Sequence, residues 1–422
     1  MITLLVIILA TFASSSLQFS LLGSAWPVIY SDLGVPIGNA GIIAMISAIS
    51  AVMGAFLSDK IGQRFNTGLI LVACMTATSL ALLGFSFSYS FVALCVFAVP
   101  LGFGGGMIDS VLNNFVALHY KAKHMNWLHS FWGLGALIGP LIMATAIDFG
   151  SWSWGYIAIS ALQFTMVLIL LGSLPLWRKF VKMEQDKRNV DFAKLHETAE
   201  NLGKSGENSA KSAAKPANPE KSQKNKTSKK QAIALPGAKF ALLTFLFYCS
   251  IEAVVDLWSS TYLVTNRAIA PEVAARFLSL YYLGITAGRF TAGFLTEKFT
   301  SRQLIHFGQT LIAIGVFSLF LPLPETFAAG SLLLIGLGCA PIFPCLMHET
   351  SKNFAREHSQ TLVSLQVTFA YMGNTFAPPL FGLVGQLLGY WIFPNFVAGL
   401  LTIIVITVVV MYRRVGKRSE VV

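Results

Sequence analysis

Three acidic residues stand inside long apolar stretches of the sequence. Asp109 lies in the stretch 91–118, and Glu252 and Asp256 lie four residues apart in the stretch 239–265. A carboxylate in hydrocarbon costs several kcal/mol, so an acid in such a place marks an ion or substrate path by default. Two acids on one helical face repel when both are ionised, so one is expected to hold a proton or bind a cation. The sequence therefore predicts proton-coupling roles for Asp109, Glu252 and Asp256.

Each acid also has a plainer interpretation. Asp109 could be a structural carboxylate that neighbouring amides satisfy, with Asn113 one helical turn away as the nearest candidate. Asp256 could face the outer water while only Glu252 is buried. Sodium is the alternative to the proton as the coupling ion.

Amide and aromatic side chains in the same stretches suit a sugar. Pyranose faces stack on aromatic rings, and sugar hydroxyls hydrogen-bond to Asn and Gln. Many such residues serve packing or the membrane interface instead, so only some are expected to touch a solute. The substrate-binding candidates are Gln18, Asn113, Asn114, Trp132, Trp258, Tyr262, Tyr281, Tyr282, Gln366, Tyr371 and Asn374.

The composition is that of a polytopic membrane protein. Of the 422 residues 55% are hydrophobic and 12% charged, and the mean hydropathy is +0.67, whereas soluble domains carry about 25% charged residues. The net charge is +11, but the segment 177–239 holds 15 Lys and Arg against 7 Asp and Glu. The excess of base is thus a property of one loop, and no nucleic-acid partner is predicted.

Residues typical of enzymes and of cofactor sites are missing from the sequence. The five cysteines are scattered through apolar stretches without a CxxC spacing, so they predict neither a metal site nor a disulfide framework. No zinc-ligand spacing, nucleophile elbow or Walker loop occurs, so an ATP-driven motor and an enzyme are both disfavoured. We expect no cofactor.

Charged residues, glycines and prolines divide the sequence into twelve apolar stretches, each suited to cross about 30 Å of hydrocarbon as a helix. The predicted fold class is an all-α membrane protein with twelve transmembrane helices in two pseudo-symmetric six-helix bundles. The predicted domains are a first bundle at 1–176, a basic linker at 177–238, a second bundle at 239–412 and a basic tail at 413–422. The predicted spans are 3–30, 37–58, 67–87, 91–118, 126–147, 153–176, 239–265, 273–296, 303–321, 327–350, 360–388 and 391–412.

The Lys and Arg residues fall on alternate connections between the spans. The other connections hold only Arg267 and Arg276. By the positive-inside rule, both termini and the linker are predicted to be cytoplasmic, in a multi-pass protein of the cell's inner membrane. The linker segment 203–236 is rich in Lys, Ser, Ala and Asn and is predicted to be flexible.

Two motifs recur in the second half of the chain at the same offset. The turn with Asp59, Lys60 and Arg64 returns 238 positions later with Glu297, Lys298 and Arg302, and Gly135-x-x-x-Gly139-Pro140 returns as Gly373-x-x-x-Ala377-Pro378. A shared offset indicates duplicated halves. We predict that the charged turns form a gate at the cytoplasmic edge, because a carboxylate there can accept hydrogen bonds from a helix N-terminus and from Arg. Ordinary solvated charges are the alternative.

Arg289 is the one arginine well inside a predicted span. It is included with the gating residues. It either pairs with a buried acid or extends towards the cytoplasmic surface.

These features resemble the major facilitator superfamily. Asp59 to Arg64 resembles the superfamily's signature loop between helices two and three, except that Ala55 stands where the pattern has glycine. More narrowly, the chain resembles the bacterial branch allied to fucose permease. The segments that carry this resemblance are 108–120, 127–140, 248–264, 283–295 and 340–350.

The resemblance implies a permease for a sugar or a related polar solute, commonly driven by protons. The predicted function is alternating-access transport of a small polar solute with proton symport, by a monomer in a lipid bilayer. An exporter of drugs or metabolites is one alternative, although Met143 and Ala144 replace glycines of the antiporter motif. A membrane sensor that binds solute without transporting it is the other.

Overall fold

The computed structural model describes residues 2–205 and 229–419. These residues form helices, and no strand occurs among them. The predicted flexible segment 203–236 lies for the most part, at 206–228, outside the described residues. The helices of the first half are α1 Ile2–Ser16, α2 Leu21–Asp32, α3 Asn39–Gly62, α4 Thr67–Ser86, α5 Phe91–His119, α6 Ala122–Asp148 and α7 Trp152–Ser205. Those of the second half are α8 Lys229–Ala234, α9 Ala238–Arg267, α10 Pro271–Leu295, α11 Ser301–Phe320, α12 Glu325–Asn353, α13 Arg356–Leu388, the 3₁₀ turn η2 Tyr390–Ile392 and α14 Phe393–Ser419.

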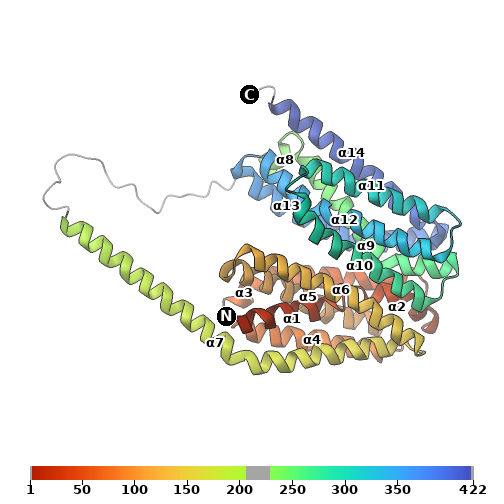
Figure 1. Ribbon diagram of the computed structural model, residues 1–422. Coiled ribbons are helices and arrows are strands. Elements are labelled where there is room, and N and C mark those ends of the chain that lie inside the picture. Colours follow the sequence, from red (N-terminus) through yellow and green to blue (C-terminus); the bar gives the residue numbers. More distant parts are fainter. Residues whose placement is uncertain (1, 206–228, 420–422) are drawn as a thin grey trace.

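The helices form two bundles, α1 to α7 and α8 to α14, which lie one above the other in Figure 1. The two chain ends and the extension of α7 all lie at the left of that view. We call this the basic end, because Lys60, Lys121, Lys298 and Lys352 lie in connections or helix termini there. The other is called the opposite end. Since each bundle makes six passes, both termini belong on one side.

The predicted twelve passes are confirmed. Among the described residues, ten helical stretches are long and apolar enough to cross a membrane, with α1 and α2 counted as one and η2 joined to α14. The other two passes are α10 and α13, of 25 and 33 residues. The hydropathy of these two helices is lowered by arginines such as Arg276 and Arg289 in α10 and by amides such as Gln366 and Asn374 in α13.

Two helices differ from their predicted bounds. The predicted span 3–30 is broken, because α1 ends at Ser16 and α2 begins at Leu21. The predicted span 153–176 is part of a longer helix, because α7 continues without a break to Ser205. The first difference matters for function, since a broken helix leaves backbone carbonyls without partners in the middle of the membrane.

Glycines set how closely the helices approach one another. A Cβ on Gly135 of α6 would lie 2.1 Å from the carbonyl oxygen of Ala13 in α1, and one on Gly373 of α13 would lie 2.3 Å from that of Leu246 in α9. The motif repeated at the 238-residue offset therefore makes the same contact in both halves. In each case the fifth pass packs against the first pass of its own bundle, which explains physically why glycine stands there.

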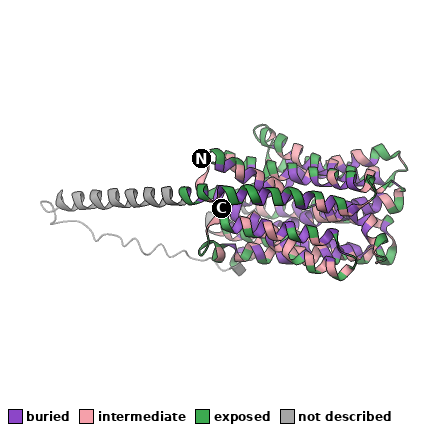
Figure 2. Ribbon diagram, turned by 90° about the horizontal axis from the view of Figure 1, so that it is seen from below, coloured by how far each residue is buried: buried purple, intermediate pink, exposed green. Residues whose placement is uncertain are grey.

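Buried side chains fill both bundles along their length (Figure 2). One core extends through both halves, and its first-half members, such as Trp26, Phe85 and Tyr156, lie towards the opposite end. A separate core, with members such as Phe12 and Phe115, fills the first half near the basic end. The two halves thus share packing at the opposite end, and each packs on its own near the basic end.

Candidate functional site

The three predicted coupling acids lie near the middle of their helices. Asp109 is ten residues before the end of α5, so it lies about 15 Å from that end at about 1.5 Å per residue. Asp256 is eleven residues before the end of α9, on the same helix as Glu252. All three side chains are partly buried.

Asp109 has neutral partners. The side-chain nitrogen of Asn113 donates to the carboxylate at 3.1 Å and to the backbone carbonyl of Asp109 at 2.9 Å. Tyr371 of α13, from the other half, is 37% exposed and lies near enough to interact electrostatically with Asp109. Within the described chain the carboxylate forms no ion pair, so nothing there compensates a negative charge.

Glu252 sits between one hydroxyl and one cation. The Tyr248 hydroxyl lies 2.6 Å from its carboxyl oxygen and 2.8 Å from the carbonyl oxygen of Cys339. A hydroxyl has one proton and can serve only one of two acceptors, so both contacts are hydrogen bonds only when Glu252 is itself protonated. The guanidinium of Arg289 lies 3.8 Å away, at the limit of an ion pair. Glu252 therefore has a suitable partner in either protonation state.

Asp256 is hydrogen-bonded to one member of a group of aromatic side chains that contact each other across the two halves. The buried Tyr282 donates its hydroxyl proton to Asp256 at 2.7 Å. The Tyr282 ring lies 6.5 Å from that of Trp132 in α6, which in turn meets Phe19 edge-on at 5.2 Å. Two predicted binding residues, Trp132 and Tyr282, are thus brought together across the interface between the halves.

Gln18 lies in the break between α1 and α2. Its side-chain oxygen accepts a hydrogen bond of 3.0 Å from the buried Gln163 of α7. A Cβ on Gly105 of α5 would lie 3.1 Å from the Gln18 side-chain nitrogen. Gly105 precedes Asp109 by one helical turn, so Gln18 and Asp109 flank the same face of α5.

For the remaining binding candidates the structure gives different burial and different partners. Tyr281 is buried beside Tyr282, Asn374 is partly buried in α13, and Asn114 is exposed near the basic end. Three candidates make structural contacts to backbone or side chain: Trp258 donates to the carbonyl of Pro378, Tyr262 to that of Leu319, and Gln366 to the hydroxyl of Thr350.

The predicted gating residues are solvent-exposed at the basic end. Asp59, Lys60 and Arg64 lie where α3 ends and in the turn after it, and within the described chain none of them forms an ion pair. Their counterparts Glu297 and Lys298 are likewise exposed. Arg302 lies over the ring of Tyr412 at 4.8 Å. Arg289 lies deeper, beside Glu252.

The halves approach each other closely from near the middle of α9 to the opposite end. A Cβ on Gly23 of α2 would lie 2.2 Å from the carbonyl oxygen of Asp256, and one on Gly41 of α3 would lie 2.5 Å from Cα of Pro379. Asp148 and Arg276 form an ion pair of 3.4 Å between α6 and α10. Neither member of that pair was among the predicted site residues.

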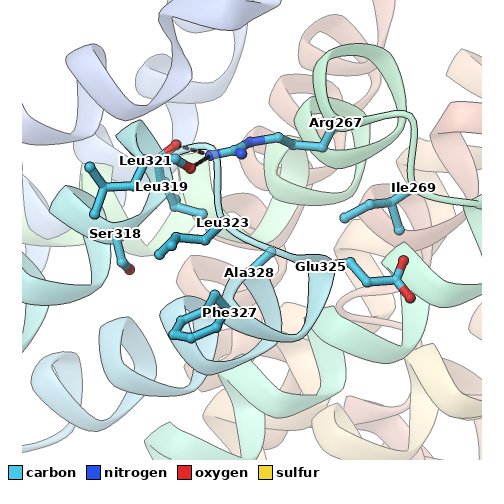
Figure 3. A pocket seen from close by; sticks show the side chains of 9 residues that line it. All are labelled: Arg267, Ile269, Ser318, Leu319, Leu321, Leu323, Glu325, Phe327 and Ala328. Carbon is cyan, nitrogen blue, oxygen red and sulfur yellow. Dashed lines mark hydrogen bonds between the residues drawn. The ribbon is translucent and has the colours of Figure 1, made fainter.

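Two cavities lie away from these acids. One, of about 100 Å³ at the opposite end, is bordered by Arg267, whose guanidinium points to the carbonyl oxygens of Leu319 and Leu321 (Figure 3). Arg267 there donates to backbone carbonyls where α11 ends, which is a structural role. The other, of about 370 Å³, lies near the basic end among α3, α4 and α5 and includes Asp59 and Asn114.

Several residues that contact the candidate site residues or join the two halves were not singled out from the sequence. Tyr248 is one turn before Glu252, so the spacing of an aromatic hydroxyl and an acid at i and i+4 was a usable signal. Gln163 carried no comparable signal, because its partner Gln18 is distant in the sequence. The same holds for Asp148 and Arg276, which belong to different halves.

The chain matches a known protein family. The family described as "Major Facilitator Superfamily" matches residues 8–265 and again residues 240–421. The two matches together span nearly the whole chain, and their order follows the two bundles.

Relatives among characterised proteins are distant. "Bypass of stop codon protein 6" of Saccharomyces cerevisiae is 22% identical over 268 residues, which is 62% of this chain and 50% of that protein. The chain thus spans about half the length of that relative. "Glucose/mannose transporter GlcP" of Bacillus subtilis is 22% identical over 363 residues, 85% of this chain and 82% of that protein.

The fold is shared with solved transporter structures. A peptide transporter POT mutant in complex with sulfate has a TM-score of 0.71 at 14% identity, over 98% of this chain and 95% of that one. At this identity the likeness shows the fold alone.

Proposed function

This chain belongs to the major facilitator superfamily, and from that premise we propose that it is a secondary transporter that moves a sugar by alternating access with proton symport. The superfamily and the structural neighbours are transporters and not enzymes, in agreement with the prediction from sequence. The finer resemblance to the fucose permease branch remains a prediction.

The proposal depends chiefly on the partners of the three central acids. Asp109 and Asp256 are hydrogen-bonded by a neutral amide and a neutral hydroxyl, and only Glu252 has a cation beside it. A carboxyl group in hydrocarbon without a countercharge is cheaper to hold with a proton than without. Uptake of a proton then lowers the cost of the intermediate in which both sides are closed, and this couples the ion gradient to transport.

A sugar is supported by the side chains around the acids and by one relative. Gln18, Trp132 and Tyr282 offer an amide and aromatic rings near Asp109 and Asp256. Hydroxyl-rich rings are recognised by such combinations of stacking and hydrogen bonding. The similarity to a protein named as a glucose and mannose transporter extends over most of both chains.

The arrangement of the halves supports a conformation open to the basic end. The close contacts of Gly23 and Gly41 lie between the middle of α9 and the opposite end, whereas the charged turns at Asp59 and Glu297 are exposed at the basic end. The positive-inside rule makes the basic end cytoplasmic. We therefore assign an inward-facing state, in which the predicted cytoplasmic gate is released and would form on the return to the outward-facing state.

Uptake into proteoliposomes tests the proposal. Purified protein is reconstituted, an inward proton gradient is imposed, and a panel of labelled hexoses that includes glucose and mannose is offered. We expect accumulation of at least one hexose above its equilibrium level, and collapse of that accumulation when a protonophore is added. Liposomes without protein are the control.

Other outcomes select the alternatives. Absence of hexose uptake together with proton-driven efflux of a dye would favour the exporter. Binding of a hexose without flux in either direction would favour the sensor. Accumulation that depends on an imposed sodium gradient and not on the proton gradient would show that sodium is the coupling ion.

A further inference from the structure

A chain of hydrogen bonds through the buried Gln163 connects α4 and α7 to the break in the first pass. The hydroxyl of Thr78 in α4 donates to the side-chain oxygen of Gln163 at 2.9 Å. The Gln163 nitrogen donates both to the backbone carbonyl of Ser14 at 3.2 Å and to the side-chain oxygen of Gln18 at 3.0 Å. Gln163 is fully buried, with 0% of its surface exposed, so its amide is held by these three contacts.

The backbone carbonyl of Ser14 fixes the direction of the whole chain of amides. A carbonyl only accepts hydrogen bonds, so the Gln163 nitrogen must face it, and the hydroxyl of Thr78 adapts because it can donate or accept. With its nitrogen on that side, Gln163 offers Gln18 a donor. The side-chain oxygen of Gln18 accepts this hydrogen bond, so the side-chain nitrogen of Gln18 is turned away from Gln163.

The broken helix explains why that carbonyl is free. In a continuous helix the carbonyl of Ser14 would accept from the backbone N–H of Gln18, four residues on. Because α1 ends at Ser16, its last carbonyls have no partner within the helix. The break therefore supplies the acceptor that orients Gln163, and through it Gln18.

We propose that Gln163 is a positioning residue that holds Gln18 so that it presents an N–H donor to the solute. The Gln18 nitrogen lies beside Gly105, where the lack of a Cβ leaves room, and Asp109 follows one turn along α5 at about 6 Å. A donor and an acceptor at this spacing suit a solute with an oxygen acceptor next to a hydroxyl donor, as in a polyol or sugar. The inference rests on the proposed transport of sugars and adds that Gln18 is the hydrogen-bond donor in one contact with the sugar.

Gln163→Glu is the decisive change, because a buried carboxyl group has almost the same shape as the amide but only one proton, and the carbonyl of Ser14 takes that proton. With no donor left to face it, Gln18 should turn its nitrogen to the new carboxyl group and present its oxygen to the solute. Uptake of glucose is compared with that of monofluoro-deoxyglucoses, since fluorine accepts weakly but cannot donate. We expect the analogue with fluorine at the contacted position to lose about tenfold more in kcat/KM than glucose does, through KM and not kcat.

Two further variants separate positioning from general damage. Gln163→Leu removes the hydrogen bond to Gln18 without reversing the orientation of the Gln18 amide. The kcat/KM values for glucose and for the fluorinated analogue should therefore fall by the same factor. The matched control is Gln309→Glu, which places a carboxylate at another buried amide, in α11 of the other half; it should leave the ratio of the two substrates unchanged. In a double-mutant cycle, Gln163→Glu should add little to Gln18→Ala. The proposal would be overturned if Gln163→Glu lowered kcat/KM equally for glucose and for the fluorinated analogue, and if its effect simply added to that of Gln18→Ala.

The orientation can be measured even if no sugar is transported. In protein labelled with ¹⁵N at glutamine side chains, the amide protons of Gln163 should exchange with water slowly and those of Gln18 rapidly. The Gln163→Glu variant should slow exchange at Gln18, because the Gln18 nitrogen becomes bonded to the introduced carboxyl group. Unchanged exchange at Gln18 would refute the positioning role, whereas a failure of sugar uptake alone would refute only the proposed substrate.

Discussion

At the scale of single residues, the central acids differ in the partners that the fold gives them. Asp109 is bonded by an amide and Asp256 by a tyrosine hydroxyl, while Glu252 lies between Tyr248 and Arg289. A carboxylate with a cation beside it keeps its charge at lower cost than one without. For the proposed proton symport, we therefore expect the coupling proton to bind at Asp109 or Asp256, whereas Glu252 has one partner for each protonation state.

The substitution Asp109→Asn tests this division. It keeps the shape of the side chain and the contact with Asn113 but removes the titrating group. We expect gradient-driven accumulation to fall to the equilibrium level, a loss of at least about tenfold, while counterflow exchange of hexose continues. Uptake and counterflow are measured in the same proteoliposomes.

A matched control uses an exposed acid. Glu325→Gln neutralises a carboxylate in the first turn of α12, at the opposite end, and should leave accumulation as it is. Normal accumulation by Asp109→Asn would remove Asp109 from the coupling role.

Sequence reasoning predicted the acids because their cost in hydrocarbon depends on residue type and local composition alone. It could not predict their partners, since Tyr282 is 26 residues from Asp256 and Gln163 is 145 residues from Gln18. It also could not separate Trp258 and Tyr262, which bond backbone carbonyls, from Trp132 and Tyr282. All four are aromatic residues in apolar helices, and only the packing distinguishes them.

At the scale of helices, glycines determine where backbones touch. The repeated glycine motif was visible in the sequence, and its contacts in both halves account for it. The break between α1 and α2 was not predicted, because residues 17–20 read Leu, Gln, Phe and Ser, with neither glycine nor proline. The contacts of α6 give a reason, since Gly139 packs against the carbonyl of Leu17 within the break.

The contact of α2 with α9 gives a prediction at this scale. In Gly23→Ala the new Cβ would lie 2.2 Å from the carbonyl oxygen of Asp256, so the helices must separate. Overpacking of this kind typically costs about 1–3 kcal/mol. We expect a lower Tm in thermal unfolding of the detergent-solubilised protein, together with slower hexose uptake.

The control is Gly172→Ala in α7, where a Cβ would meet nothing within 4 Å. Alanine is the better helix former by about 1 kcal/mol, so its Tm should equal or exceed that of the wild type. Equal Tm values for the two variants would show that the contact of α2 with α9 does not limit the stability of the protein.

At the scale of the whole molecule, the two halves share a core at the opposite end and separate cores near the basic end. Duplicated halves could be predicted from the shared offset of two motifs. The conformation could not, because one sequence must satisfy both the inward-facing and the outward-facing state, and their free energies differ little. Small contacts between the halves then decide the populations.

The ion pair of Asp148 with Arg276 is such a contact. It joins α6 to α10 at 3.4 Å, with side chains 59% and 49% exposed. An exposed pair contributes at most about 1 kcal/mol, which is little for stability but changes a two-state ratio about fivefold. We expect Asp148→Arg and Arg276→Asp each to favour opening at this end, and the double exchange to restore the original balance.

Spin labels on Tyr89 and Glu325, exposed residues of different halves at the opposite end, report the distance between the halves by pulsed electron resonance. Each single reversal should lengthen the mean distance, because two like charges then face each other. High salt should reduce that effect, since about 1 M salt screens charges beyond about 3 Å. A double exchange that behaves like either single reversal would mean that the pair does not hold this end closed, and the packing of Gly23 and Gly41 would have to account for closure alone.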